Sequence, residues 1–129
     1  MSFDWTGYLV VATDLSVSDD ESRCRTSISR AYYSAFHLAL DWMVSKDPQL
    51  KLSVPKDGRV HEFVLDHFNS SKSRQGLFVA GKLRSLRRSR TAADYDSTTP
   101  VGKAQAQTSL DQAKKLMEAL KTLEAPKAV

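Results

Sequence analysis

The segment 18–44 constrains the fold most, because a helix drawn through it is apolar on nearly every side. One stripe at helical spacing contains Ile28, Ala31, Tyr32, Ala35, Ala39 and Trp42. The other side of the same helix adds Tyr33, Phe36 and Leu40. A helix of this kind is stable only when neighbouring elements bury it on several sides. The segment therefore predicts a central helix that starts at a capping box of Ser18 and Glu21 and ends before Pro48.

Four further helices are predicted around this central helix. Apolar side chains recur at helical spacing over residues 4–15, 59–68, 73–93 and 103–124, and no stretch alternates as a strand does. In the two middle helices, one face carries Val60, Phe63, Val64 and His67, and the expected inward side chains are Leu77, Phe78, Leu83 and Leu86. A chain of 129 residues has the size of one domain. We therefore expect a single all-α domain over 1–129, with a disordered tail from about residue 125.

Several classes of protein are excluded by what the sequence lacks. A single cysteine, Cys24, rules out a disulfide framework and a cysteine-rich zinc site. The longest apolar run, residues 8–12, is too short to cross a bilayer, and the N-terminus has no secretory signal. Glycine-rich phosphate loops and the common hydrolase motifs are missing as well. We therefore expect a soluble cytoplasmic protein that uses no metal or cofactor and does not bind membranes.

Positive charge is concentrated in the middle of the chain. Residues 51–95 hold ten basic and four acidic side chains, a net charge of +6, whereas residues 1–50 carry a net charge of −3. The densest part contains Lys82, Arg84, Arg87, Arg88 and Arg90. Arginine is suited to forked contacts with phosphate, so Arg84, Arg87, Arg88 and Arg90 are candidate residues for binding RNA or a nucleotide. The alternative is a helix face that is merely solvated.

Polar residues interrupt the apolar surface of the central helix. Arg30, Tyr33 and His37 follow one another at helical spacing, so they lie along one side. A charged arginine in a buried helix needs a partner or access to water. Asp94 on the fourth helix is the expected carboxylate, and Arg30, Tyr33 and Asp94 would then form a structural polar core.

The end of the fourth helix contains the other candidate site. Asp94 follows Arg90 by four residues, close enough to pair on the helix surface. An arginine beside a proton-transfer group is what RNA cleavage without a metal ion requires. Residues 87–96 contain no histidine, and His37, His61 and His67 all lie on earlier helices. A catalytic site would therefore have to assemble across helices.

Four blocks of the chain resemble the HEPN family, named for higher eukaryotes and prokaryotes nucleotide-binding. The first block is Ser29-Arg30-Ala31-Tyr32-Tyr33-Ser34-Ala35-Phe36-His37. The others are Phe3-Asp4-Trp5-x-x-Tyr8-Leu9, Val60-His61-Glu62-Phe63-Val64 and Leu86-Arg87-x-x-Arg90-x-x-Ala93-Asp94-Tyr95-Asp96. They fall in the expected order over nearly the whole chain, and the last resembles the compact bacterial branch that ends in Ala-Asp-Tyr.

This resemblance implies an up-and-down bundle of four to five helices that is commonly a homodimer. Many family members are metal-independent endoribonucleases of toxin–antitoxin or anti-phage systems, and some pair with a nucleotidyltransferase-like protein. The family arginine carries over to Arg88 or Arg90, and the tyrosine that often follows the motif carries over to Tyr95. The catalytic histidine of the family has no counterpart, because residues 92–96 are Ala-Ala-Asp-Tyr-Asp.

Three hypotheses about function follow. The first is an RNA- or nucleotide-associated HEPN protein of a toxin–antitoxin or defence module, in which Arg90, Asp94, Tyr95 and His37 are the candidate catalytic residues. The second is a non-catalytic HEPN dimer that binds a nucleotide, RNA or a neighbouring nucleotidyltransferase-like or antitoxin protein, with Arg30 and Asp94 as a structural ion pair. The third is a structural or regulatory dimer.

Overall fold

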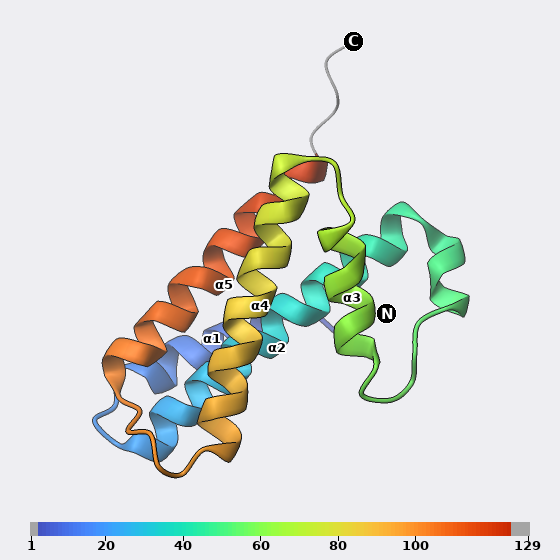
Figure 1. The fold of residues 1–129 in the computed structure, drawn as a ribbon. Coiled ribbons are helices and arrows are strands. Elements are labelled where there is room, and N and C mark those ends of the chain that lie inside the picture. Colours follow the sequence, from blue (N-terminus) through green and yellow to red (C-terminus); the bar gives the residue numbers. More distant parts are fainter. Residues whose placement is uncertain (1–2, 125–129) are drawn as a thin grey trace.

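The computed structural model describes residues 3–124, and every element in that range is helical (Figure 1). The elements are α1 (Thr6–Ser16), α2 (Glu21–Lys46), the 3₁₀ helix η1 (Pro48–Leu52), α3 (Val60–Asn69), α4 (Arg74–Tyr95) and α5 (Lys103–Glu124). The predicted all-α bundle is confirmed. The tail predicted from about residue 125 lies outside the described residues. No helix within residues 3–124 combines the length and apolarity needed to cross a membrane.

Helix α2 is the centre of the bundle, as the sequence predicts. It packs against α1, α4 and α5, and its C-terminal half also contacts α3 and η1. Ala31, Ala35 and Ala39 are fully buried along it, so neighbouring helices approach its backbone closely. Figure 1 shows α4 and α5 running side by side across α2. The apolar surface on several sides of α2 therefore has a helix to cover it on each side.

Two helix starts differ from the sequence prediction. The capping box of Ser18 and Glu21 does not form, because Asp20 caps α2 by accepting a hydrogen bond from the backbone N–H of Arg23 at 3.1 Å. Ser18 Oγ accepts instead from the backbone N–H of Asp20 at 3.0 Å, which shapes the turn before the helix. The loop predicted after α2 also contains a helical turn, η1, with Pro48 at its first position.

Two side chains predicted to point inward on α4 are exposed. Leu77 keeps 46% of its surface exposed and Phe78 keeps 42%. The inward face of this part of α4 is supplied by Val79, Ala80 and Leu83. Residues 77 and 78 precede that face by about 100–200° around the helix, so they point toward solvent. His67, expected on the apolar face of α3, also lies at its exposed edge.

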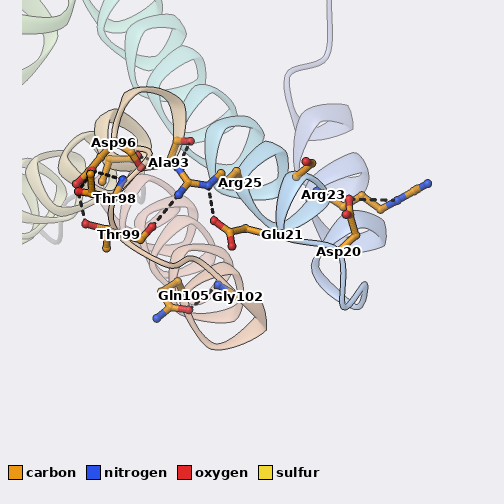
Figure 2. Close-up of polar contacts among 12 residues, drawn as sticks. Asp20, Glu21, Arg23, Arg25, Ala93, Asp96, Thr98, Thr99, Gly102 and Gln105 are labelled. Carbon is orange, nitrogen blue, oxygen red and sulfur yellow. Dashed lines mark hydrogen bonds and ion pairs between the residues drawn. The ribbon is translucent and has the colours of Figure 1, made fainter.

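Arg25 joins α2 to the C-terminal end of α4 (Figure 2). Its guanidinium donates to four backbone carbonyl oxygens, those of Ala92 (3.2 Å), Ala93 (2.9 Å), Asp96 (2.8 Å) and Thr99 (2.7 Å). Its Nε donates to Glu21 Oε2 at 2.9 Å. The last carbonyls of a helix have no partner within the helix, and a positive charge there also opposes the helix dipole favourably. Arg25 thus satisfies the end of α4 and fixes it against α2.

The turn after α4 is held by the side chain of Asp96 (Figure 2). Asp96 Oδ1 accepts hydrogen bonds from the backbone N–H of Thr98 at 2.9 Å and from its hydroxyl at 2.7 Å. Asp96 Oδ2 accepts from the hydroxyl of Thr99 at 2.7 Å. These hydrogen bonds lower the pKa of Asp96 to about 2, so the carboxylate stays charged. The turn and the helix end therefore form one ordered unit.

Replacing Arg25 is expected to destabilise the fold. Arg25→Ala leaves carbonyl oxygens at the end of α4 without their charged donor, which should lower the free energy of unfolding by about 2–3 kcal/mol. Arg23→Ala is the matched control, since the Arg23 side chain is 64% exposed and should change stability by less than about 0.5 kcal/mol. Urea denaturation of both variants measures the difference, and equal losses would contradict the role of Arg25.

Candidate functional site

Tyr33 of α2 lies at the centre of a group of charged and titratable side chains. The guanidinium carbons of Arg30 and Arg90 lie 5.4 and 5.5 Å from the centroid of its ring. The imidazole centroids of His61 and His37 lie 6.0 and 6.2 Å from the same point. We call Arg30, Tyr33, His37, His61 and Arg90 the Tyr33 cluster. It draws on α2, α3 and α4, so a site assembled across helices is present geometrically.

Arg90 is the most buried member of the cluster. Only 9% of its surface is exposed, and its guanidinium lies against the rings of Tyr32 at 5.5 Å and Tyr95 at 5.9 Å. Asp94 Oδ2 lies 3.7 Å from its Nη1, as expected for residues four apart on a helix. Its buried Nε has no hydrogen-bond partner. Because one carboxylate at this distance compensates the charge only partly, the cluster keeps an attraction for a further anion.

The ion pair expected between Arg30 and Asp94 does not form. Asp94 Oδ2 accepts a hydrogen bond from Ser29 Oγ at 3.3 Å, and Ser29 Oγ accepts one from Arg30 Nη2 at 3.4 Å. Arg30 instead places its guanidinium 4.7 Å from the ring centroid of Tyr8. Asp94 faces Arg90 because the two residues share a helix, and Ser29 separates it from Arg30. The polar core of Arg30, Tyr33 and Asp94 is thus connected through Ser29 and Arg90.

His61 is a site residue that the sequence analysis did not single out. Its Nδ1 lies 2.6 Å from the hydroxyl of Tyr32, a hydrogen bond that fixes the orientation of the imidazole. Burial raises the pKa of Tyr32 well above its usual value, so the hydroxyl keeps its proton. Burial, and then the charges of Arg87 and Arg90, lower the pKa of His61. Its imidazole is therefore neutral at physiological pH and able to accept a proton.

His37 has a similar electrostatic setting at the other end of the cluster. Its ring stacks on that of Trp5, with centroids 3.6 Å apart and planes within 10° of each other. Burial lowers its pKa, and the nearby His61 and Arg30 lower it further. The candidate residue His37 is thus held next to α1, while Asp94 lies beside Arg90 on α4.

An open groove of about 840 Å³ runs between α3 and the C-terminal half of α4. We call it the basic groove. Its lining includes Arg84, Arg87, Arg88, Tyr95, Glu62 and Leu65. Tyr95 keeps 77% of its surface exposed here, and its ring also lies 5.9 Å from the guanidinium of Arg90. The groove and the Tyr33 cluster are therefore adjoining parts of one surface.

The three arginines of the basic groove differ in how far they are already engaged. Arg87 Nη1 lies 2.6 Å from Glu62 Oε1, and Arg84 Nη1 donates a long hydrogen bond of 3.4 Å to Asn69 Oδ1. Arg88 is exposed and forms no ion pair with any residue in the range 3–124. Arg84 and Arg88 are thus the groups most available to an external phosphate, whereas Arg90 is largely enclosed.

Comparisons with known proteins found no match among family models, curated proteins or solved structures. Across residues 3–124, no three His, Cys, Asp or Glu side chains lie close enough together to hold a metal ion. What the chain does must therefore be inferred from its own side chains.

The histidines of the cluster are expected to titrate below the usual value of 6.5. The unfolded chain then binds more protons than the folded one as the pH falls below 6.5, so His37 and His61 should make the fold less stable in acid. An NMR titration of the imidazole proton signals between about pH 5 and 8 measures the midpoints. Midpoints at or above 6.5 for both residues would contradict the buried, positively charged setting.

Proposed function

We propose that this protein is a HEPN-type domain that binds single-stranded RNA along the basic groove. The observation that carries the proposal is the gathering of Arg84, Arg87 and Arg88 around one open groove together with the exposed ring of Tyr95. Arginines contact phosphates through forked hydrogen bonds, and an aromatic ring stacks on an unpaired base. The sequence blocks that resemble the HEPN family support the same assignment.

The charges of the groove favour binding along the RNA backbone. Arg84 and Arg88 would neutralise phosphates directly, because neither forms an ion pair within the described part of the chain. Arg87 is held by Glu62, so it contributes less unless the phosphate displaces that carboxylate. No motif for reading base sequence is involved, so the proposal concerns the backbone and stacking rather than sequence specificity.

Cleavage of the bound RNA without a metal ion is a second candidate function, favoured by the Tyr33 cluster. A neutral imidazole, that of His61, would take the proton from a ribose 2′-hydroxyl, whose oxygen attacks the neighbouring phosphorus. The 5′-oxygen leaves with a proton and a 2′,3′-cyclic phosphate remains. Arg90 would stabilise the negative charge on the phosphate oxygens. His61 thereby replaces the histidine that the family places after its arginine, and Asp94 orients Arg90.

The biological setting follows from the family resemblance. We place the protein in the cytoplasm as a homodimer that belongs to a toxin–antitoxin or anti-phage module. A neighbouring nucleotidyltransferase-like or antitoxin protein is its expected partner. The alternative is a non-catalytic HEPN dimer that binds a nucleotide or a partner protein through the same surface, and the enclosed position of Arg90 favours this alternative over cleavage.

RNA binding should depend on the exposed arginines of the groove. Replacing both Arg84 and Arg88 with alanine removes two phosphate contacts, so the slope of log affinity against log salt should fall by about 1.4. Affinity for a labelled single-stranded RNA should drop at least about tenfold at about 50–100 mM salt, measured by fluorescence anisotropy. Lys114→Ala with Lys115→Ala is the matched control, since it removes the same charge from exposed positions on α5. Equal losses in both double variants would overturn the assignment to the groove.

RNA cleavage should proceed in EDTA and should require the Tyr33 cluster. His61→Gln removes the proton acceptor and Arg90→Lys removes the forked donor, so each should reduce the cleavage rate at least about a hundredfold. His67→Gln is the matched control, because His67 also lies on α3 but outside the cluster. Gel analysis of a labelled RNA measures the rates, and circular dichroism checks the fold of each variant. Binding without cleavage by the wild-type protein would reject the catalytic function and leave the non-catalytic one.

A further inference from the structure

The outer face of α4 exposes large apolar side chains that no other element covers within residues 3–124. Leu77 and Phe78 near its start are 46% and 42% exposed, and Tyr95 at its end is 77% exposed. The core is served by the opposite face of the helix, where Val79 and Leu86 are fully buried. Isolated exposed apolar residues are common, but three on one side of one helix indicate a contact surface.

The spacing along this face is that of a helix-packing seam. Phe78, Gly81, Ser85, Arg88, Ala92 and Tyr95 follow one another at alternating steps of three and four residues, and we call them the α4 seam. A side chain added at Gly81 would meet no atom within 4 Å, so no contact inside the chain requires a glycine at this position. A glycine weakens a helix interior, and close approach of a second backbone accounts for its presence here.

Charge selects what can occupy the seam. Arg74, Lys82, Arg84 and Arg88 lie on or beside this face, and Lys82 Nζ lies 5.1 Å from the ring centroid of Phe78. The one acidic residue of α4, Asp94, already faces Arg90. A second copy of α4 would therefore place cations against cations, whereas a helix flanked by Asp and Glu would neutralise them.

We propose that the α4 seam docks an acidic amphipathic helix of another protein. Its apolar side chains would lie against Phe78 and Leu77 and across Gly81, and its carboxylates would meet Lys82, Arg84 and Arg88. This is a helix-in-groove contact in which spacing supplies the register and charge supplies the choice of partner. Docking does not depend on RNA binding, but a docked helix covers Arg88 and Tyr95 and so excludes RNA from the basic groove.

A designed peptide tests the proposal on the full-length protein. The peptide has about 20 residues, with Leu and Ala at seam spacing and Glu at the flanking positions, and it carries a fluorescent label. A scrambled peptide of the same composition keeps the charge and loses the seam. Fluorescence anisotropy at about 100 mM salt should show that the seam peptide binds at least about tenfold more tightly than the scrambled one.

Variants of α4 then locate the binding site. Gly81→Trp fills the seam without entering the core, because the space beside Gly81 is open, and it should weaken peptide binding at least about tenfold. Phe78→Ser should have a similar effect. Leu52→Ser is the matched control, since Leu52 is 93% exposed on η1, and it should leave the affinity unchanged. Circular dichroism confirms that each variant is folded.

Four outcomes would overturn the proposal. Equal binding of the scrambled peptide would mean attraction by charge alone, and full binding by Gly81→Trp would place the contact elsewhere. A dimer in sedimentation velocity that Gly81→Trp splits would identify a second copy as the occupant. Tighter binding to anionic lipid vesicles that Phe78→Ser abolishes would identify a membrane surface instead. Intact peptide binding together with absent RNA binding would reject the proposed function and leave the docking face standing.

Discussion

The hydrogen bonds of Arg25 to the end of α4 are the interaction on which the candidate site depends. Four carbonyl oxygens that the helix cannot satisfy itself share one guanidinium supplied by α2. The last turn of α4 contains Asp94 and Tyr95, and Arg90 lies one turn earlier. If that turn frayed, Arg90 would lose its contacts with Asp94 and Tyr95 together. The geometry of the Tyr33 cluster is thus set by a residue that is not part of it.

A second constraint is the placement of two arginines on the two sides of Tyr33. Their charges, together with burial, keep His37 and His61 from taking up protons at neutral pH. The single nearby carboxylate, Asp94, lies 3.7 Å from Arg90 and does not contact Arg30 directly. The surface is therefore positive yet holds neutral imidazoles, which is the combination that a phosphodiester needs for binding and for loss of a proton. The same arrangement also suits a bound anion that does not react.

The sequence predicts the helices well because apolar spacing is a local property. It places α5 at the observed bounds and α2 at the centre, since both follow from side chains within one segment. It misses Arg25 and His61, whose partners are separated from them by long stretches of chain. It turns Leu77 and Phe78 inward because spacing records that a face is apolar and not what covers it. It pairs Arg30 with Asp94 because it cannot show that Ser29 lies between them.

That last group of misses says something about α4. A helix that served only the core would have no reason to keep Leu77 and Phe78 in water or a glycine at an open position. Both features weaken the isolated chain, and both lie on the face that also carries its free cations. The inner face of α4 encloses Arg90 and faces the cluster, whereas the outer face presents Arg88 beside apolar side chains. Because the two faces share one rigid helix, a partner seated on the outer face necessarily controls what reaches the basic groove.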